Sequence, residues 1–378
     1  MNAPLAPARL HSGAGRRDAT RPAWHRGVRR ILVIKWSALG DVALATAIME
    51  DLRLAFPDAT MHLNTLPAAQ ALFAADPRFE RVLAIDVRAP GQRLLQAWHW
   101  LRAVRAGNYD LLVDLQASDH TRLLIGLLPM LGCRIRQRLG WRGGFPYTLH
   151  NAVRTRGLHP IAAMRAMLAH AGIEARTTRP LLRVPPTLAD AALDLLQRHG
   201  LTARGFAVFM PGSQAAGWLK RWGADRYAQL GCLLLERGLE RIVLIGARDE
   251  AEECARIRAA ITRSHPGRVV HLDDLHLLQI VSVCARARWI IANDTGIAHV
   301  AAVCGRPLVV LCGPTDARRV KPLGPQVRAL QARDGCLNCY AKTCRHADAP
   351  QCLARIEPAC VARLLLDDAC TATDINIL

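Results

Sequence analysis

The chain has 378 residues, of which 51% are hydrophobic, enough to bury a large core in roughly two to three domains. This composition excludes a disordered, collagen-like or small disulfide-stapled protein, and no apolar run is long enough to predict a transmembrane helix. The formal net charge is +19, and only four of the 50 basic residues are lysine. This charge favours an anionic partner, a requirement that nucleic acid, a membrane surface or a phosphorylated small molecule would each satisfy.

Residues 1–30 hold seven arginines against one aspartate, with Pro, Gly and Ala and little periodic apolar pattern. We interpret this segment as a flexible basic arm, because such a sequence buries too little apolar surface to become ordered. It lacks the continuous apolar stretch of a secretory signal. A transit peptide, a solvated tail without a role and an arm that binds anionic lipid headgroups all fit its composition.

The pattern from residue 31 to about residue 180 predicts alternating strands and helices. We expect strands at 31–35, 61–66, 81–86 and 109–115, and helices at 42–56, 92–106 and 121–131. Short apolar runs that alternate with helical segments are typical of a parallel sheet covered on both faces. A proline-rich, aperiodic stretch at 179–186 then predicts a linker between two domains.

The second half of the chain repeats this arrangement. We expect strands at 206–210, 241–245, 269–272, 289–292 and 308–312, and helices at 188–199, 226–237, 250–263, 277–287, 296–304 and 356–366. The predicted fold class is α/β, with two Rossmann-like domains, 31–180 and 181–350, that face each other across a cleft. Such sheets bind ligands beyond the carboxyl ends of their strands. The chemistry should therefore lie in the turns that follow strands.

The first of these turns runs from Lys35 to Asp41 and opens a predicted helix. Two interpretations of Asp41 are open: an acid that stabilises the helix N-terminus through the helix dipole, or a carboxylate that faces the cleft as a general base. The turn does not match the G-x-G-x-x-G pattern, which disfavours a dinucleotide site in the first half.

A second turn follows the strand predicted at 206–210. Gly212 and Ser213 offer backbone N–H groups and a hydroxyl to phosphate oxygens, and Lys220 adds a point charge suited to a diphosphate. Because the chain uses far more arginine than lysine, a lysine in this loop suggests that arginine would not serve there. The alternative is an exposed cation without a ligand.

A third turn reads N-D-T-G from Asn293 to Gly296, with His299 one turn into the next predicted helix. Free N–H groups at the start of that helix favour an anion. Asp294 would otherwise serve as a helix N-cap, and His299 as a partly buried histidine with partners of its own. Several turns of this kind in one chain favour a ligand site over separate structural roles.

Four motifs occur in a fixed order along the chain: Ser37-Ala-Leu-Gly-Asp41, Pro211-Gly-Ser with Lys220-Arg-Trp222, Asn293-Asp-Thr-Gly-Ile-Ala-His299, and Gly313-Pro-Thr-Asp316. Together they resemble glycosyltransferase family 9, the bacterial lipopolysaccharide heptosyltransferases. The resemblance extends from about residue 31 to at least residue 361. It implies a GT-B fold, whose last helix, here within residues 351–378, returns to the N-terminal domain.

The resemblance implies an inverting enzyme that moves heptose from an ADP-sugar donor to the lipopolysaccharide inner core, the Kdo/heptose region of a lipid A acceptor. No cofactor or metal is implied for catalysis. Asp41 is the implied base and Lys220 the diphosphate ligand, while Glu250 binds the donor ribose and Leu275 lies near adenine. The implied donor contacts are Gly212, Ser213, Lys220, Glu250, Leu275, Asp294, Thr295, Gly296 and His299.

The implied location is the cytoplasm, peripheral to the inner membrane, where an anionic glycolipid is the acceptor. A protein-directed heptosyltransferase, which modifies autotransporters, would share the donor residues and differ in its acceptor. The largely apolar loop at 214–219, and Gly223 in place of the family's common proline, leave another nucleotide-sugar donor open. A nucleic-acid-binding protein would explain the charge, but the chain lacks helix-turn-helix, RNP and zinc-finger patterns and has only 5% aromatic residues.

Six of the twelve cysteines lie at or after Cys336. The spacing of four of them is close to that of metal ligands and suggests a structural zinc or iron site. Reduced thiols or a disulfide would account for the same residues. The autotransporter heptosyltransferases, which this chain resembles, suggest an iron site by analogy, although their cysteine spacing differs from the spacing here. The candidate ligands are Cys336, Cys339, Cys344 and Cys352.

Overall fold

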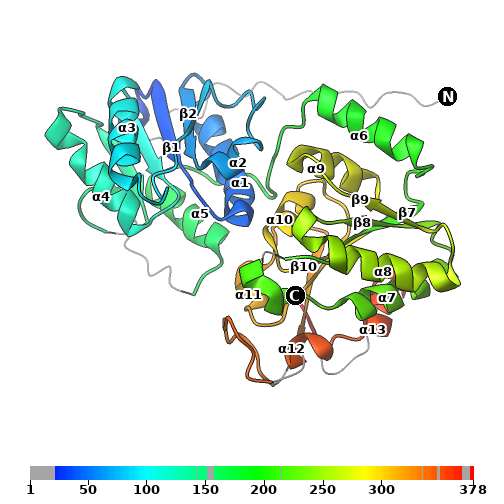
Figure 1. Cartoon of the computed structure of the whole chain (residues 1–378). Helices are drawn as coiled ribbons and strands as arrows, with labels where there is room; N and C mark the ends of the chain where they lie inside the picture. Colours follow the sequence, from blue (N-terminus) through cyan, green and yellow to red (C-terminus); the bar gives the residue numbers. More distant parts are fainter. Residues whose placement is uncertain are drawn as a thin grey trace.

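The structure, a computed structural model, describes residues 22–141, 143–150, 157–213, 215–333, 335–346, 350–367 and 375–378. It contains two α/β domains, each built on one sheet with helices on both faces (Figure 1). This arrangement confirms the predicted α/β class with two domains. Near the predicted linker, Val184 and Leu188 pack on the core cluster that contains the N-terminal domain, whereas Ala192 and Leu196 belong to a core cluster of the C-terminal sheet.

The N-terminal sheet is parallel and has the strand order β3-β2-β1-β4-β5-β6. One face is covered by α1, α2 and α5, and the other by α3 and α4. The elements are β1 (Arg30–Ile34), α1 (Leu39–Ala55), β2 (Thr60–Thr65), α2 (Pro67–Gln70), β3 (Arg81–Ala84), α3 (Arg93–Ala106), β4 (Leu111–Asp114), α4 (Asp119–Leu127), η2 (Pro129–Leu131), β5 (Gln137–Gly140), β6 (Leu149–His150) and α5 (Pro160–His170).

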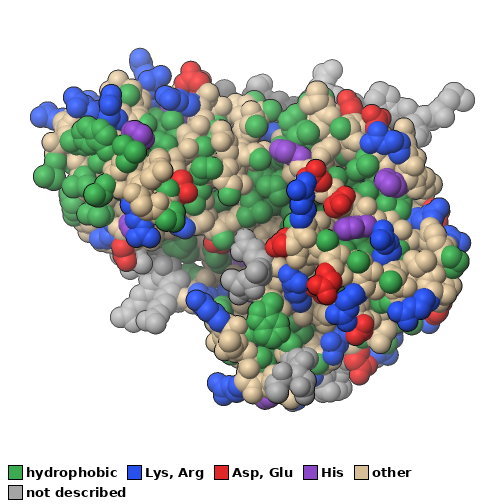
Figure 2. Space-filling model, in the orientation of Figure 1, with side chains coloured by type: hydrophobic (Ala, Val, Ile, Leu, Met, Phe, Trp, Pro, Cys, Tyr) green, Lys and Arg blue, Asp and Glu red, His purple; other side chains and the backbone are tan. Residues whose placement is uncertain are grey.

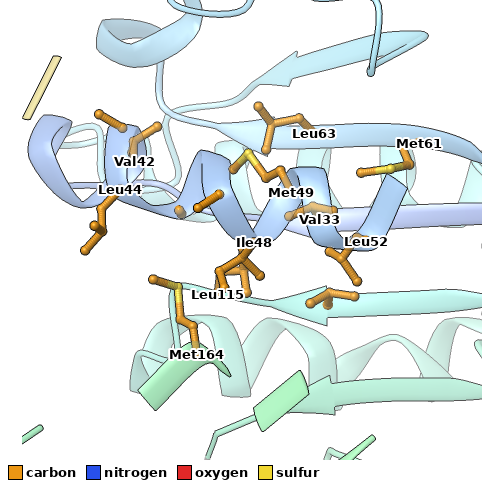
Figure 3. Close-up of a cluster of buried hydrophobic side chains, with 14 of the residues drawn as sticks. Val33, Val42, Leu44, Ile48, Met49, Leu52, Met61, Leu63, Leu115 and Met164 are labelled. Carbon is orange, nitrogen blue, oxygen red and sulfur yellow. The ribbon is translucent and has the colours of Figure 1, made fainter. Parts of the chain in front are cut away.

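Helix α1 lies at the centre of the N-terminal core. Its Ile48 and Leu52 pack against Val33 of β1 and Leu63 of β2, and Met164 of α5 joins the same cluster (Figure 3). The central strands are continuous apolar runs because both of their faces are buried. This packing fixes α1 along its length, so the first turn of the helix, which carries Asp41, has a defined position.

The C-terminal sheet has the order β13-β12-β11-β10-β7-β8-β9, parallel except for β13. Helices α7, α8, α12 and α13 cover one face, and α6, α9, α10 and α11 cover the other. The elements are α6 (Pro186–Arg198), β7 (Phe206–Met210), η3 (Ala215–Lys220), α7 (Ala224–Glu236), β8 (Arg241–Ile245), η4 (Arg248–Glu250), α8 (Ala251–Ser264), β9 (Val269–Leu272), α9 (Leu277–Arg286), β10 (Trp289–Asn293), α10 (Gly296–Ala302), β11 (Leu308–Leu311), α11 (Ala317–Val320), β12 (Val327–Ala332), α12 (Gln351–Ala354), α13 (Pro358–Asp367) and β13 (Ile375–Ile377).

The end of the chain differs from the expectation that residues 351–378 return to the N-terminal domain. Helix α13 packs against α7, and its Val361 and Leu364 belong to the C-terminal core. Strand β13 pairs antiparallel with β12, and Leu378 exchanges two hydrogen bonds with Ala329. The apolar side of α13 is therefore buried within its own domain.

The expected basic arm, residues 1–30, is also shorter than predicted at its inner end. Residues 1–21 lie outside the described residues. The following segment is packed: η1 (Ala23–His25) places Trp24 against the N-terminal core, and its ring lies 6.0 Å from that of Phe56. His25 Nε2 is 3.1 Å from the carbonyl oxygen of Ala171. The apolar surface of Trp24 orders residues that the arginine content alone assigned to the arm.

Candidate active site

The C-terminal residues predicted to bind the donor lie at the carboxyl ends of neighbouring strands. Each follows its strand by a short turn, and all of these turns lie on one edge of the sheet because the strands are parallel. The predicted groups therefore form one line across the sheet, as a single elongated ligand requires. In sheet order they are Asp294 after β10, Gly212 and Ser213 after β7, Glu250 after β8 and Leu275 after β9; Thr315, which was not predicted to bind the donor, follows β11 at the same edge.

Lys220 and Asp294 form an ion pair near the middle of this line. Lys220 Nζ donates to Asp294 Oδ2 at 2.8 Å, and Thr315 Oγ1 donates to the same oxygen at 2.6 Å. The Asp294 side chain is only 6% exposed, whereas that of Lys220 is 31% exposed. A buried carboxylate thus holds an accessible ammonium group. The N-cap of α10 is Thr295, and Asp294 is engaged by Lys220 and Thr315 instead.

Asn293 joins two of the turns and was given no role by the sequence reasoning. Its side chain is fully buried, and Nδ2 donates to the carbonyl oxygens of Pro211 and Gly212. Its Oδ1 accepts hydrogen bonds from Trp222 N at 3.3 Å and from the Tyr227 hydroxyl at 3.2 Å. A polar residue that is buried at the end of an apolar strand needs hydrogen-bond partners. An asparagine directly after the apolar run of β10 is therefore the sequence signal that could have identified Asn293 as a linking residue.

Gly212 is required by the side chain of Glu250. A Cβ at position 212 would lie 1.8 Å from Glu250 Cδ, so only glycine admits the carboxylate at this position. Glu250 Oε2 accepts a hydrogen bond from Ala247 N at 2.9 Å, and burial raises the pKa of this carboxyl group. The structure thus brings the second predicted turn and the predicted ribose ligand together.

Ser213 is buried, and its hydroxyl has partners within its own loop. Ser213 Oγ donates to the carbonyl oxygen of Gly217 at 2.9 Å and accepts from Arg221 Nε at 3.3 Å. Arg221 also donates to the Ser213 carbonyl oxygen and, through Nη1, to Glu253 Oε2 at 3.1 Å. These bonds stabilise the loop that ends at Lys220, so the Ser213 side chain has a structural role in addition to its predicted contact with phosphate.

The first turns of α1 and α10 meet across the domain boundary. A Cβ on Gly296 would lie 3.2 Å from Gly40 N, and a Cβ on Gly40 would lie 2.8 Å from His299 Cδ2. Two glycines therefore permit this close approach. Asp41 follows Gly40 and accepts a hydrogen bond from Ala38 N at 3.3 Å. The contact places the predicted base of one domain beside the predicted donor turn of the other.

Two polar atoms at this boundary are buried without a hydrogen-bond partner among the described residues: His299 Nδ1 and Thr295 Oγ1. Burial lowers the pKa of His299 below the ordinary 6.5, against the opposing charges of Asp294 and Asp41. The imidazole is therefore neutral at pH 7 and acts as a hydrogen-bonding group there. Orphaned polar atoms are rare in folded proteins, and these two lie beside Gly40 and Asp41, where a ligand would pair with them.

The turn that carries Asp41 is held by two amide side chains from neighbouring strand ends. Gln116 Oε1 accepts hydrogen bonds from Trp36 N and Ser37 N at 3.1 and 3.2 Å. Asn64 Oδ1 accepts the indole N–H of Trp36 at 2.7 Å. Sequence reasoning identified neither amide, because their partners are distant in the chain and become neighbours only in the parallel sheet.

The four cysteines predicted as metal ligands line one small pocket together with His346. Among the residues that the structure describes, however, no three His, Cys, Asp or Glu side chains are gathered to hold a metal ion. Cys352 is buried against Gly313, whose added Cβ would lie 3.0 Å from its sulfur, while Cys339 is exposed. The predicted metal site is therefore not formed among the described residues, although the four cysteines surround one pocket.

The cysteine-bearing loop instead contacts the turn after β11. Tyr340 N donates to the carbonyl oxygen of Pro314 at 2.9 Å, and Asp316 N donates to the Tyr340 hydroxyl at 3.2 Å. Asp316 caps α11 by accepting from Arg318 N at 3.0 Å. The loop thus supports the turn that carries Thr315. Asp316, the carboxylate of the fourth sequence motif, serves as the N-cap of α11.

Comparisons with known proteins identify relatives of this chain. Lipooligosaccharide heptosyltransferase 2 of Haemophilus ducreyi is 27% identical over 319 residues, which cover 81% of this chain and 89% of the relative. Escherichia coli ADP-heptose lps heptosyltransferase II superposes with a TM-score of 0.69 at 24% identity, over 90% of this chain and 99% of that chain. The dodecameric iron-containing heptosyltransferase TibC of enterotoxigenic Escherichia coli, in complex with ADP-D-β-D-heptose, gives a TM-score of 0.51 at 13% identity, over 90% of this chain and 76% of that chain.

The facing Rossmann-like domains are the GT-B fold of these structural neighbours. The family model described as glycosyltransferase family 9 (heptosyltransferase) matches residues 97–349, more than half of the chain. That range contains three of the four motifs on which the resemblance was drawn, including Lys220, Asp294 and His299, whereas Asp41 lies outside it. With its fold and the family match in agreement, the chain belongs to glycosyltransferase family 9.

Proposed function

We propose that this family 9 member transfers heptose from ADP-heptose to the inner core of lipopolysaccharide, with inversion at the anomeric carbon and without a catalytic metal. One observation carries the proposal: Asp41 lies across the domain boundary from the Lys220–Asp294–Thr315 cluster, at the contact of Gly40 with Gly296 and His299. A proton acceptor and a diphosphate-binding cation thus come from opposite domains. The relatives named above carry heptosyltransferase names, and one was crystallised with ADP-heptose.

The donor is proposed to lie along the carboxyl edge of the C-terminal sheet. Its diphosphate would bind Lys220, its ribose hydroxyls would donate to Glu250, and its adenine would pack near Leu275. From β10 to β9 there are three strand steps in the sheet order, or about 14 Å at the usual spacing of about 4.8 Å. That distance is comparable to the length of an extended nucleoside diphosphate, so one donor can contact all three residues.

The reaction is a single displacement at the anomeric carbon. Asp41 takes the proton from the acceptor hydroxyl as the hydroxyl oxygen attacks, and the bond between the anomeric carbon and the phosphate oxygen breaks with its electron pair leaving on ADP. Attack from the face opposite the leaving group inverts the configuration. Hydrogen bonds from Trp36 and Ser37 to the side chains of Gln116 and Asn64 hold the turn from Trp36 to Asp41 in place. The turn thereby positions the Asp41 carboxylate for this step.

The negative charge that develops on ADP is proposed to be stabilised at the start of α10. The Lys220 ammonium group, held by Asp294, supplies a positive charge, and the N–H groups of Thr295 and Gly296 supply donors. The neutral His299 ring adds a hydrogen bond rather than a charge. Preorganised donors of this kind each contribute roughly a hundred- to a thousandfold to the rate.

The acceptor is proposed to be an anionic glycolipid at the cytoplasmic face of the inner membrane. The net charge of +19 favours approach to such a surface. In the described part of the chain, no helix is long and apolar enough to cross a membrane. Peripheral attachment is therefore the mode of membrane association that we propose.

The test is a ligand screen followed by a transfer assay. ADP and ADP-heptose should raise the melting temperature of the protein more than UDP-sugars do, because a ligand that binds only the folded state stabilises it. The enzyme should then transfer heptose to a Kdo-containing lipid A acceptor. Transfer to an autotransporter passenger but not to the glycolipid would replace the proposed acceptor, and stabilisation by UDP-sugars alone would replace the donor.

A further inference from the structure

The outer side of α3 carries large apolar side chains that the described chain leaves uncovered. Leu94 is 89% exposed, and Leu95 and Trp98 are also among the exposed large hydrophobic residues. On the opposite side of the same helix, Trp100 and Val104 pack into the core. Core packing therefore accounts for one side of α3 and leaves the apolar character of the other unexplained.

Helix α4 and the segments around it extend this surface. Leu123 of α4 is exposed, Met130 of η2 is 81% exposed, and Phe145 lies over α4, since a Cβ on Gly126 would be 3.0 Å from its ring. Helices α3 and α4 contact each other on the same face of the sheet. We define the α3–α4 patch as Leu94, Leu95, Trp98, Leu123, Met130 and Phe145, which are six of the eleven exposed large hydrophobic residues in the described chain.

The patch is concentrated in one region of the molecule. Figure 2 shows hydrophobic side chains gathered where Figure 1 places α3 and α4, with Lys and Arg side chains at the adjoining edge. Single exposed leucines are common on soluble proteins, but an apolar patch with a polar rim marks an interaction surface. The six exposed large hydrophobic residues of the α3–α4 patch therefore indicate a surface that binds a partner.

A pocket lined by arginines lies beside the C-terminal half of α3, next to the α3–α4 patch. Arg102 follows Trp98 by four residues and shares its side of α3, and Arg102, Arg105 and Arg134 line a cavity of about 570 Å³. The acid in that cavity, Asp110, already accepts hydrogen bonds from the backbone of Arg29 and Arg30. Within the described chain, no ion pair neutralises the three lining arginines, so the cavity is suited to external anions.

The topology places Leu94, Trp98 and Leu123 of this surface towards the catalytic edge, whereas Met130, which follows α4, lies at the end of the arginine pocket. Helices α3 and α4 follow β3 and β4 and so begin at the carboxyl edge of the sheet, the edge at which Asp41 follows β1. Leu94 and Trp98 lie in the first turns of α3, and Leu123 lies in the second turn of α4. The arginine pocket lies at the opposite ends of the helices.

We propose that the α3–α4 patch and the arginine pocket dock the enzyme on an anionic phospholipid bilayer. The patch residues insert at the boundary of headgroups and acyl chains, and the guanidinium groups bind lipid phosphates. The arm at residues 1–21 is a poor occupant because its four arginines and single aspartate repel the pocket. The inference rests on the proposed glycolipid acceptor, whose headgroup would reach Asp41 while its acyl chains stay in the bilayer.

The experiment compares the binding of the full chain to vesicles of phosphatidylcholine with and without phosphatidylglycerol. Combining Leu94→Ser, Trp98→Ser and Met130→Ser should weaken binding to anionic vesicles by about a thousandfold, because each buried apolar side chain contributes about tenfold or more. Combining Arg102→Gln with Arg105→Gln should weaken it by about 25-fold, since each arginine contributes about fivefold at an anionic surface. The arginine variant should bind vesicles of phosphatidylcholine alone as the wild type does.

Matched controls come from exposed residues elsewhere, Leu54→Ser on α1 and Arg263→Gln on α8, which should bind as the wild type does. All variants should keep the wild-type melting temperature and, with a deacylated water-soluble acceptor, the wild-type transfer rate. If the wild type transfers nothing to that acceptor, the proposed function fails while the vesicle result still stands.

Three results would overturn the docking proposal. The first is unchanged vesicle binding in both patch variants. The second is a loss of binding that follows deletion of residues 1–21 and not the patch substitutions. The third is a wild-type dimer that the substitutions dissociate without affecting vesicle binding, which would make the patch an interface between copies of the chain.

Discussion

The two domains supply the candidate site in different ways. The C-terminal domain contributes a row of side chains on neighbouring strand ends that bond to one another, as in the Lys220–Asp294–Thr315 cluster. The N-terminal domain contributes one carboxylate, Asp41, on a turn fixed by the side-chain amides of Gln116 and Asn64. Donor binding should therefore depend on a network, whereas proton transfer should depend on one group. Substitutions in the two domains should separate these two properties.

The largest effect is expected from Asp41→Asn. This substitution keeps the shape of the side chain and removes its basicity, so transfer should fall about a thousandfold, within the range of general-base catalysis. ADP affinity should change by less than about twofold, because no donor contact is assigned to this residue. Transfer kinetics with calorimetric titration of ADP measure the two effects separately. Full activity in the variant would remove Asp41 from the mechanism.

The substitution Lys220→Ala should instead affect both properties. Loss of the cation should lower the transfer rate by roughly a hundred- to a thousandfold and weaken ADP binding, because Lys220 would bind the diphosphate before and during bond breaking. Lys342→Ala, at an exposed lysine outside the cluster, is the matched control. Lys220→Ala kinetics and ADP affinity equal to those of the control would contradict the assignment.

A third substitution, Asn293→Ala, tests the network through stability. It leaves the Trp222 N–H group without its buried acceptor and the Tyr227 hydroxyl with only the carbonyl oxygen of Met210 at 3.4 Å, which should cost about 2 kcal/mol of unfolding free energy. ADP binding should weaken as well, because Asn293 joins two donor turns. Urea denaturation with and without ADP measures both effects.

In the other domain, Gln116→Ala should lower the transfer rate and leave ADP affinity unchanged. If Asn293→Ala and Gln116→Ala lost ADP affinity equally, the two domains would not differ in the way proposed.

The smallest expected effect is on pH dependence. Because burial holds the pKa of His299 below 6.5, the ring is neutral in both folded and unfolded chains at higher pH. As the pH falls below 6.5, the unfolded chain takes up a proton that the buried ring does not, so the unfolding free energy falls. His299→Gln should reduce that slope by up to about 1.4 kcal/mol per pH unit. An unchanged slope in the His299 variant would mean that the ring titrates as freely in the folded chain as in the unfolded one.

Local pattern was sufficient for much of the C-terminal domain. Strands β7, β8 and β9 have the bounds expected from their apolar runs, because those runs are short, continuous and bounded by turns. Helix α5 was missed, since its alanines and methionines give no clear polar face. The two-residue strand β6 is too short to leave a periodic signal.

The predicted site residues were found at strand ends, but their pairings required the fold. Nothing in the sequence indicates that Gly40 contacts Gly296, or that Asn293 links two turns, because each contact joins residues far apart in the chain. The cysteine spacing suggested a metal centre, and the four cysteines do line one pocket, but among the described residues no three ligands are gathered to hold a metal ion. The crossing of the last helix, expected from family resemblance, was wrong because α13 buries its apolar side against α7.

Strand β13 has a consequence for the handling of this protein. Residues 375–378 cover the edge of β12, and Leu378 satisfies both backbone groups of Ala329. Removal of these few residues by proteolysis would leave a six-residue, largely buried strand with an open row of hydrogen-bonding groups, a template for pairing between molecules. Loss of the carboxyl end should therefore appear as aggregation rather than as loss of catalysis, and a purification tag is better placed at the amino end.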